Sequence, residues 1–343
     1  MTRVVHIVWG LNTGGIETML VNIVNRQRTS ALVTLVVIND AVNEELIASI
    51  DPEVEIIRLG RKVGSRNPIP IIKLNTLLLR LNPQAIHCHS YSIASYLLPS
   101  LRKRAVLTMH TTLAIGNMTR KALLKYREVY AISGSVQRLL QEEFNIESKV
   151  IYNGIDFEHF EVRSVPRNNN IRIVQVGRLI PEKGHNLSLL ALKELTDYPW
   201  EFDIIGSGEY EHYLKELTQT LGLTDRVHFL GGKSQQYLQQ NLKSYDILLQ
   251  PSLAEGFGLT AIEAMAANVA VIASDVDGLK EVTDGGRLAT LFTSGDYELL
   301  MVAIKCMLEQ PIDELQLADI RRKAIEKFHI RTTVEQYLKE YGV

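Results

Sequence analysis

The sequence predicts an α/β protein of two Rossmann-like domains, each a parallel sheet with helices on both faces. Its 343 residues are enough for two domains of ordinary size. Apolar segments of strand length alternate with segments of helical spacing from the start of the chain, which is typical of parallel sheets. The alternation is interrupted once, at the polar residues 161–170, where Pro166 and three asparagines favour a linker.

In the first series, short apolar and β-branched runs predict strands. A helix follows the first strand, because Ile16, Met19 and Ile23 recur at helical spacing. Another helix spans Ile69–Leu81 and ends before Asn82 and the proline after it. The predicted strands are Val4–Trp9, Leu32–Ile38, Val54–Leu59, Ala85–Cys88, Ala105–Met109 and Val129–Ser133, and the other helices are Glu44–Ser49 and Val136–Phe144.

The second series repeats the alternation from Ile171 onward, and helical segments continue to the C-terminus. Loops at the carboxyl ends of parallel strands meet at one edge of a sheet, so we expect ligands to bind there. The predicted strands are Ile171–Val176, Phe202–Ile205, Val227–Leu230, Tyr245–Gln250 and Val269–Ala273, and the helices between them are Leu187–Leu195, Tyr210–Leu221, Tyr237–Leu242 and one that starts near Gly258.

Composition excludes several classes of protein. The hydrophobic content of 46% supports packed cores rather than disorder. The most apolar stretches, such as Leu32–Ile38, are far shorter than the ~20 residues of a membrane span. The N-terminus enters a strand directly, without the pattern of a secretory leader. Cys88 and Cys306 offer neither a disulfide framework nor metal-ligand spacing. We therefore expect a cytoplasmic protein in a reducing compartment.

The net charge of −2 conceals an asymmetry between the two halves. Residues 1–165 hold 19 Lys and Arg against 14 Asp and Glu, a net +5, and the remainder holds 18 against 25, a net −7. A net +5 is too small to indicate nucleic acid. It fits docking near anionic lipid headgroups and, equally well, chance unevenness of a solvated surface.

The stretch from Pro251 to Ala266 carries the clearest chemistry. A buried strand passes through a glycine-containing loop into a helix, so that free backbone N–H groups and the positive helix end point at one spot, which suits a phosphate. Glu255 and Glu263 bracket that spot, and a nucleotide-sugar matches a phosphate flanked by hydroxyls. The alternative is an ordinary strand–helix unit with two surface glutamates.

Two further loops of the second series match an anionic ligand. The loop Gly177–Gly184 follows the first strand of that series and carries Arg178 and Lys183. The planar guanidinium of Arg178 and the ammonium group of Lys183 could both bind a diphosphate. Gly206-Ser207-Gly208 follows the next strand and allows close approach to the backbone. Taken alone, Arg178 and Lys183 would also fit two solvated loop cations.

The remaining motifs, which are a glycine-rich loop, three histidines and an Asp-x-Asp string, do not indicate a cofactor or a metal site. The glycines of Gly10–Glu17 lack the spacing of a dinucleotide fingerprint, so NAD is not expected, although Gly14-Gly15 permits close backbone approach. His87, His89 and His110 lie at strand ends without further ligand spacing, so structural or substrate-contact roles are favoured over a metal. A simple turn explains Asp275-Val276-Asp277 better than a metal-binding string does.

Together these motifs resemble the retaining glycosyltransferases of glycosyltransferase family 4, which have the GT-B fold with two Rossmann-like domains facing across a cleft. The match covers nearly the whole chain, and the E-x7-E motif at Glu255 and Glu263, with Gly-Phe-Gly-Leu inside it, is its most specific part. The other matching motifs are Gly14-Gly15-Ile16-Glu17, Ile132-Ser133, Asn153-Gly154-Ile155-Asp156, Gly177-Arg178-Leu179, Glu182-Lys183-Gly184 and Gly206-Ser207-Gly208.

The resemblance implies an N-terminal acceptor domain over residues 1–162, a nucleotide-sugar domain over 170–325 and a C-terminal helix over 326–343 that returns to the first domain. Arg178 and Lys183 should bind the donor diphosphate, Glu263 the ribose and Glu255 the transferred sugar, and His110 should lie near that sugar. The implied catalytic residues are His110, Arg178, Lys183 and Glu255, and the implied donor-binding residues are Gly15, Gly177, Gly208, Phe257, Gly258, Leu259, Thr260 and Glu263.

The family further implies a retaining hexosyltransferase that needs no metal or other cofactor and acts in surface polysaccharide biosynthesis. The acceptor would be a glycan or a lipid-linked glycan. Leu97–Arg104 and Met118–Arg127 mix apolar and basic residues, which fits either peripheral contact with the inner face of an anionic membrane or ordinary amphipathic helices. Alternatives are a same-fold enzyme on a small acceptor, a nucleotide-sugar epimerase, and a nucleotide-sugar-binding protein without activity.

Four positions depart from the family pattern. Thr111 follows His110 where aspartate is common, which leaves the role of that histidine open. Asn268 replaces a glycine, a change that a left-handed turn tolerates. Ala270 and Lys280 stand where prolines are common.

Overall fold

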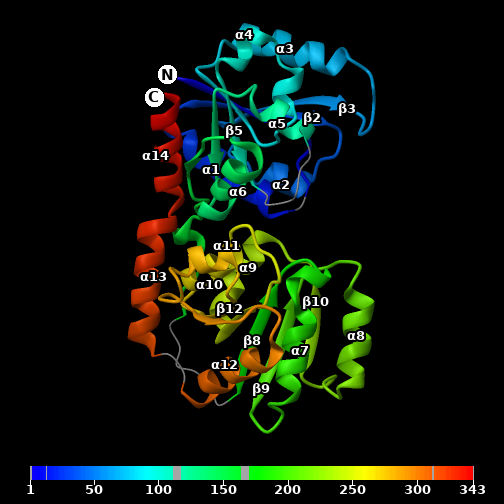
Figure 1. The fold of residues 1–343 in the computed structure, drawn as a ribbon, viewed down its shortest axis with the longest axis vertical. Coiled ribbons are helices and arrows are strands. Elements are labelled where there is room, and N and C mark those ends of the chain that lie inside the picture. Colours follow the sequence, from blue (N-terminus) through cyan, green and yellow to red (C-terminus); the bar gives the residue numbers. More distant parts are fainter. Residues whose placement is uncertain (1, 13, 111–116, 164–169, 311–312, 343) are drawn as a thin grey trace. The chain divides into compact units, whose positions relative to one another are not determined.

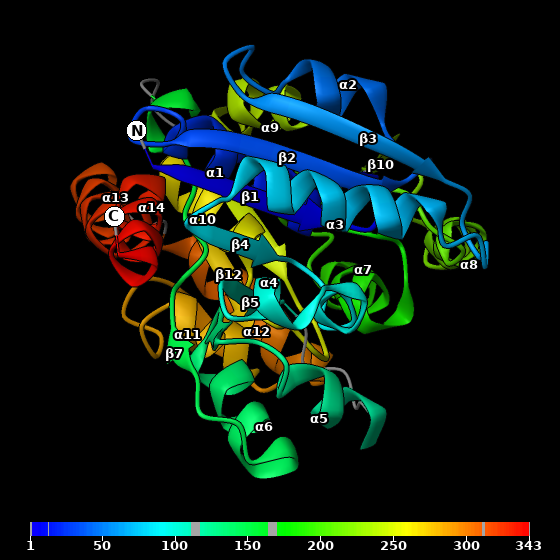
Figure 2. The same cartoon turned by 90° about the horizontal axis from the view of Figure 1, so that it is seen from above.

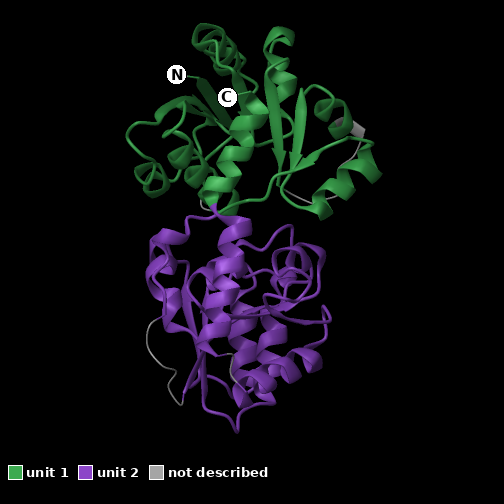
Figure 3. Ribbon diagram, turned by 90° about the vertical axis from the view of Figure 1, so that its left-hand side faces the viewer, with its two compact units in different colours: residues 1–154, 330–343 green, residues 155–329 purple. Residues whose placement is uncertain are grey.

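The computed structural model describes residues 2–12, 14–110, 117–163, 170–310 and 313–342. The chain forms two compact units, coloured separately in Figure 3. Unit 1 comprises residues 1–154 and 330–343, and unit 2 comprises residues 155–329. Residues 161–163 of the expected linker therefore belong to unit 2, and residues 164–169 lie outside the described residues.

Unit 1 is built on a seven-stranded sheet in the order β3-β2-β1-β4-β5-β6-β7, in which every pair of neighbours is parallel. Its central strands are buried on both faces, as the apolar runs predict. The strands are β1 (Arg3–Val8), β2 (Leu32–Asn39), β3 (Glu55–Arg61), β4 (Ala85–Cys88), β5 (Ala105–Met109), β6 (Glu128–Ala131) and β7 (Lys149–Val150).

Helices cover both faces of this sheet. The C-terminal α14 packs against α1, and α3 runs along β3 (Figures 1 and 2). Asparagines end two helices in the left-handed conformation, Asn82 with φ 44° and Asn145 with φ 49°. The helices are α1 (Gly15–Gln27), α2 (Glu44–Ala48), α3 (Ile69–Leu81), α4 (Pro99–Arg102), α5 (Asn117–Leu123), α6 (Gly134–Phe144) and α14 (Ile330–Tyr341).

Unit 2 is built on a six-stranded sheet in the order β10-β9-β8-β11-β12-β13, again parallel throughout. The strands are β8 (Ile171–Val176), β9 (Trp200–Ile205), β10 (Val227–Gly231), β11 (Ile247–Gln250), β12 (Ala270–Ser274) and β13 (Thr290–Phe292). The helices are α7 (His185–Lys193), α8 (Glu211–Thr220), α9 (Gln235–Asn241), α10 (Leu259–Ala266), α11 (Asp277–Val282), α12 (Tyr297–Glu309) and α13 (Glu314–Phe328).

The predicted class of two Rossmann-like parallel α/β domains is confirmed. The sequence reading missed β13, which is an edge strand of three residues, too short for a periodic signal. The single C-terminal helix expected over 326–343 is in fact two, because His329 has extended backbone angles between α13 and α14. Asn268, with φ 59°, adopts the expected left-handed turn. In the described part of the chain, no helix combines the length and the hydropathy needed to cross a bilayer.

Candidate active site

Three loops meet at the carboxyl edge of the unit 2 sheet. They follow β8, β9 and β11, three parallel strands of that sheet. Backbone bonds join them, since Leu179 N–H donates to Ser207 O at 2.9 Å and Leu253 N–H donates to Glu182 O at 2.8 Å. The glycine-rich turns that the sequence singled out in this domain therefore form one connected surface.

Glycine is required where these loops pass closest. Gly184 has a φ of +66°, and a Cβ there would lie 2.1 Å from Pro251 O. A Cβ on Gly208 would lie 2.3 Å from Leu179 O. Gly177 is different, because a Cβ there would make only ordinary contact with the Lys183 side chain at 3.8 Å. The Gly177 carbonyl instead leaves no room for a side chain on Gly206.

Lys183 and Glu255 are brought together by these loops. Their Nζ and Oε2 atoms lie 2.6 Å apart, and both side chains are only partly exposed, at 23% and 15%. The same carboxylate oxygen accepts weaker hydrogen bonds from Gln250 Nε2 at 3.3 Å and Ser252 Oγ at 3.5 Å. Buried Gln175 positions the lysine by donating to its backbone carbonyl at 2.8 Å.

Arg178 lies on the loop after β8, in the same connected surface. It is exposed, and its guanidinium has no hydrogen bond or ion pair within the part of the chain that the structure describes. Its five donors are thus available to an anion.

The N-terminus of α10 adds backbone donors to this edge. Gly258 caps the helix with a φ of +99° and has no side chain to accept from the first turn, which contains Leu259 and Thr260. The first-turn N–H groups and the positive end of the helix macrodipole together favour an anion. Phe257 is 3% exposed and its ring packs edge-on against Phe328, so it offers the loop only its backbone.

Glu263 lies on α10 and is 7% exposed. Its Oε1 accepts from Gln235 Nε2 at 2.8 Å. Burial raises the pKa of this carboxyl to about 7, and the Gln235 hydrogen bond opposes part of that rise. An acid with a pKa near neutrality is common at functional sites. Within the described residues it pairs with Gln235 and not with Glu255.

The Asp275-Val276-Asp277 string joins the end of β12 to the start of α11. Asp275 accepts from Ser294 N–H at 2.9 Å and lies 3.4 Å from Lys280 Nζ, and the Ser294 bond is the main reason that its pKa is lowered. Asp277 begins α11. Lys280, which replaces a proline common in the family pattern, therefore contributes an ion pair here.

In unit 1, Gly15 and His110 lie at the carboxyl ends of β1 and β5. Gly15 is the first residue of α1. His110 is partly buried, and burial lowers the pKa of its imidazole to about 4. Its Nε2 lies 3.2 Å from His89 Nδ1. Thr111, which left the role of His110 open, lies outside the described residues.

The histidines form a larger group than the sequence reading found. His6 pairs in register with His87 across β1 and β4, so the two share a face of the sheet. Burial lowers the pKa of His6 to about 4 and that of His87 well below its ordinary value. His87 bonds Thr108 Oγ1 at 2.7 Å and the Tyr341 hydroxyl, on α14, at 2.6 Å. The sequence signal for His6 was a polar residue inside the buried run Val4–Val8.

Comparison with known proteins places these loops in context. A family model described as Glycosyl transferases group 1 matches residues 156–327, and one described as Glycosyltransferase Family 4 matches residues 13–159. An uncharacterised glycosyltransferase of Methanocaldococcus jannaschii is 30% identical over 229 residues, 57% of this chain and 59% of the relative. The MMP alpha-(1->4)-mannosyltransferase of Mycolicibacterium hassiacum is 28% identical over 230 residues, 65% of this chain and 56% of the relative. The chain thus spans less than two thirds of the length of these curated relatives.

Solved structures share the fold. A glycosyltransferase from Rickettsia africae superposes with a TM-score of 0.84 at 20% identity, covering 99% of this chain and 97% of that one. Anabaena HepE in complex with UDP and glucose superposes with a TM-score of 0.82 at 20% identity, covering 100% of both chains.

Proposed function

Because the chain belongs to the glycosyl transferases group 1 and has the GT-B fold, we propose that it transfers a sugar from a nucleotide diphosphate-sugar to a glycan or lipid-linked glycan. The observation that carries the proposal is the carboxyl edge of the unit 2 sheet. That edge gathers Lys183, Glu255, the exposed Arg178 and the N-terminus of α10, which Gly258 caps without a side chain.

The proposed chemistry follows from these groups. Cleavage of the bond between the anomeric carbon and the phosphate oxygen leaves negative charge on the diphosphate and positive character on the sugar. Arg178, Lys183 and the α10 N-terminus supply the charge that stabilises the leaving diphosphate. Glu255 faces the transferred sugar, and Glu263 accepts from the ribose hydroxyls. Gly177, Gly208 and the backbone from Phe257 to Thr260 let the nucleotide and sugar approach closely.

We further propose a retaining reaction that needs no metal ion. The acceptor oxygen bonds the anomeric carbon on the face that the diphosphate leaves, and its proton passes to a phosphate oxygen. The cations of Arg178 and Lys183 take the place that a metal would fill on the diphosphate. Curated relatives include an O-antigen chain mannosyltransferase of Salmonella typhimurium, which supports a role in polysaccharide synthesis and a hexose as the transferred group.

A thermal-shift panel tests donor binding. UDP-, GDP- and ADP-sugars are added with and without EDTA. The sugars of one nucleotide should raise the melting temperature of the protein, and by the same amount in both conditions. If no nucleotide-sugar stabilises the protein, the donor site is wrongly assigned. If stabilisation requires a divalent ion, metal independence is wrong.

A lysine variant separates an enzyme from a binding protein. Lys183→Ala should abolish transfer or donor hydrolysis, while Lys305→Ala, which removes a surface lysine of α12, should leave the rate unchanged. A wild-type protein that binds the donor without transferring or hydrolysing it would support the binding-protein alternative. Conversion of the donor to its epimer would support the epimerase.

Membrane contact is proposed for one end of unit 1. Residues 56–127 contain 13 Lys and Arg and no Asp or Glu. Of the stretches first singled out, Leu97, Leu101 and Leu123 are buried, whereas Leu98 and Leu124 are exposed. The apolar side chains exposed on α3 are Ile69, Ile72 and Leu79, and α3 also carries Lys73 and Arg80.

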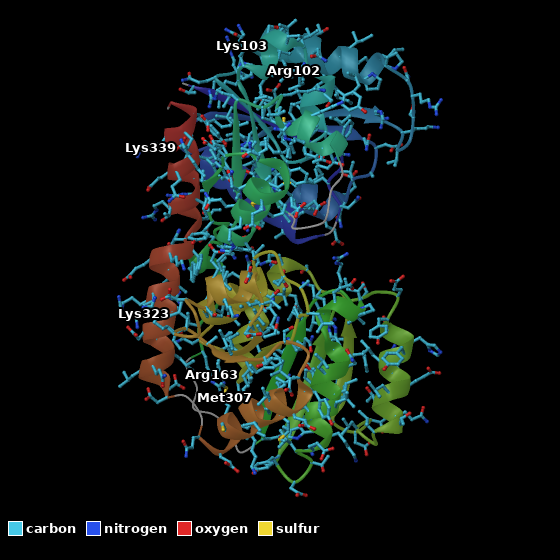
Figure 4. The ribbon with its side chains drawn as sticks, viewed as in Figure 1. Arg102, Lys103, Arg163, Met307, Lys323 and Lys339 are labelled. Carbon is cyan, nitrogen blue, oxygen red and sulfur yellow. The ribbon has the colours of Figure 1, made fainter. Side chains whose placement is uncertain are left out.

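Figure 4 places Arg102 and Lys103 at the end of unit 1 that carries α3 and α4. Apolar side chains beside lysines and arginines suit the inner leaflet of an anionic membrane, where each basic residue adds about 1 kcal/mol. This contact would bring the acceptor domain to a lipid-linked acceptor.

Vesicle binding tests the contact. Ile72→Asn should reduce cosedimentation with anionic vesicles several-fold, and the binding of both the variant and the wild type should weaken at high salt, which screens the basic residues. Leu315→Asn, at an exposed leucine of unit 2, is the matched control. Equal binding of both variants would overturn the assignment of α3.

A further inference from the structure

Four neighbouring strands of the unit 1 sheet, β3, β2, β1 and β4, end near side chains that contact one another. Arg61 is the last residue of β3, Asn39 is the last residue of β2, and Trp9 directly follows β1. Ser92 lies in the loop after β4, and Tyr96 ends the single-turn helix that comes next. We call these five residues the Trp9 cluster.

Trp9 holds the cluster together. Its Nε1 donates to Ser92 Oγ at 2.9 Å. Its ring meets the Tyr96 ring edge-on, with the two centroids 5.4 Å apart. The Arg61 guanidinium lies over the Trp9 ring, 5.5 Å from its centroid, and Arg61 Nη1 donates to Asn39 Oδ1 at 3.0 Å. An indole, a phenol and a guanidinium are therefore fixed against one another at the carboxyl edge of this sheet.

The cluster spans the topological switch point of the sheet. The chain runs from β1 to β2 and β3 on one side of β1, whereas β4, β5 and β6 follow on the other side. In open parallel sheets, ligands bind outside the carboxyl ends of the strands at the point where the strand order reverses. The hydrogen bond from Trp9 to Ser92 joins the loops after β1 and β4, which flank that point. The topology therefore favours a ligand at the cluster.

Arg61 is a cation without a counter-ion. Besides its bond to Asn39, its guanidinium donates to the carbonyl of Ser65, and in the described part of the chain it forms no ion pair. Asp40, which follows Asn39, contacts the Arg61 carbonyl through its N–H at 2.9 Å. Residues 56–127, which include Arg61, contain no Asp or Glu. The remaining N–H groups of this fixed guanidinium can bind an anion.

Tyr96 offers an open aromatic surface. It is 48% exposed, although its ring touches Trp9. Asn75 Nδ2 fixes the backbone by donating to the Tyr96 carbonyl at 2.9 Å. The face of an aromatic ring is slightly negative and the C–H groups on the face of a sugar ring are slightly positive, so the two rings stack. An exposed phenol and a guanidinium that share one indole thus match a sugar with an acidic group.

We propose that the Trp9 cluster is an acceptor subsite of unit 1, in which the Tyr96 ring stacks on a sugar of the acceptor glycan and Arg61 binds an acidic group of that glycan. The acidic group is a carboxylate, as in a hexuronic acid, or a phosphate. Trp9 contacts both Tyr96 and Arg61 and reports ligand binding. That the sugar is an acceptor rests on the proposed function, whereas its binding to the cluster does not.

Tryptophan fluorescence tests the cluster without any nucleotide-sugar. The chain has two tryptophans, and Trp200 is 1% exposed, so a ligand at the cluster changes the emission of Trp9. The protein is titrated with glucose, galactose and mannose, with their hexuronic acids and with their 6-phosphates. An acidic form of at least one sugar should bind roughly tenfold more tightly than its neutral parent, and the preferred form identifies the acidic group. Equal affinities for acidic and neutral forms, or no change with any sugar, would overturn the proposal.

Trp9→Phe locates the signal. The variant keeps an aromatic ring beside Tyr96 and Arg61 but leaves Trp200 as the sole emitter. The acidic sugar should then leave the emission unchanged. A response that persists in this variant would arise elsewhere in the protein and would rule out the cluster as its source.

Arg61→Gln tests the acidic group. Its affinity for the acidic sugar should fall roughly tenfold, to that of the neutral parent. Arg61→Lys should restore part of the loss, because an ammonium keeps the charge without the planar fork. Arg66→Gln, at an exposed arginine of the following loop, is the matched control and should bind like the wild type. If Arg61→Gln and Arg66→Gln bind alike while melting at the wild-type temperature, Arg61 does not bind the acidic group.

Tyr96→Ala tests the stacking. It should weaken the binding of the acidic sugar several-fold and keep the preference for the acidic form over the neutral one. Tyr213→Ala, at an exposed tyrosine of unit 2, should leave the affinity unchanged. Unaltered affinity in Tyr96→Ala would show that no sugar ring stacks on this side chain.

The result is separable from the donor assignment. A Trp9 response to acidic sugars in a protein that no nucleotide-sugar stabilises would leave the sugar site standing and remove the proposed transferase. Donor hydrolysis without any Trp9 response would leave the transferase standing and remove the acceptor subsite.

Discussion

Lys183 Nζ and Glu255 Oε2 form a 2.6 Å ion pair between two loops of one sheet edge. The proposed function assigns the lysine to the diphosphate and the glutamate to the sugar. A donor phosphate must therefore compete with a carboxylate of the same site for the ammonium. This competition makes the two roles separable by mutation.

Glu255→Gln should bind a free nucleoside diphosphate more tightly and transfer sugar more slowly. The substitution removes the competing charge, and because both side chains are partly exposed the pair contributes no more than ~1 kcal/mol. The expected gain in affinity for UDP or GDP is thus about fivefold, measured by isothermal titration calorimetry. Glu182→Gln, at an exposed neighbour, is the control. Weaker diphosphate binding by Glu255→Gln would contradict the competition.

Glu263 should make unit 2 less stable as pH rises. Its folded pKa of about 7 lies above the unfolded value of 4.5, so the native state binds more protons between those limits. The contribution of Glu263 to the free energy of unfolding is therefore largest below pH 4.5. It falls by about 3 kcal/mol as the pH rises to 7. Urea unfolding of wild type and Glu263→Gln at several pH values checks the difference.

The Gln variant removes the ionisable group, so the difference in stability between variant and wild type should grow in favour of the variant from about pH 4.5 to pH 7. It should also lose nucleotide affinity, because a carboxylate no longer accepts from the ribose. A difference in stability that does not change with pH would show that Glu263 ionises normally.

Gly184→Ala should disrupt the loop that carries Lys183. The new Cβ would meet Pro251 O, and the φ of +66° disfavours any side chain. Gly222 has nearly the same φ, +70°, with nothing within 4 Å of its Cβ position, so Gly222→Ala isolates the backbone effect at about 1 kcal/mol. Thermal unfolding should show a clearly larger loss for Gly184→Ala. Equal losses would mean that the Pro251 contact relaxes freely.

Most of the architecture could be predicted because its signals are local. Ile69–Leu81 was predicted with the bounds of α3, since apolar periodicity begins at a proline and ends at an asparagine followed by proline. The boundary between the two units was harder to predict, since the first domain was expected to end at residue 162 and unit 1 leaves off at Gly154. The chain passes from one unit to the next at Gly154, where a Cβ would lie 2.7 Å from Ile330 Cα, so the crossing depends on a contact with residues distant in sequence.

The candidate site divides in the same way. The loops around Lys183 and Glu255 were found because glycines and charges mark them in the sequence. The ion pair was not, because residues 72 positions apart meet only once β8 and β11 are neighbours. Tyr341, whose hydroxyl lies 2.6 Å from His87 Nδ1, was missed because it looks like an ordinary helix residue until α14 is packed in unit 1.

Tyr341→Phe should weaken the docking of α14 on unit 1. The substitution leaves His87 Nδ1 buried without the hydroxyl that lies 2.6 Å from it, and an unsatisfied buried polar atom costs about 1–3 kcal/mol. Two units need not unfold together, so the readout is amide hydrogen exchange in α14 and β4, where protection should fall roughly tenfold or more. Tyr96→Phe, at an exposed tyrosine of the same unit, should leave exchange unchanged. Unaltered protection in Tyr341→Phe would mean that the other contacts of α14, such as the Tyr337 hydroxyl beside Thr108 Oγ1 and the buried Leu338, are enough to hold the C-terminal helix.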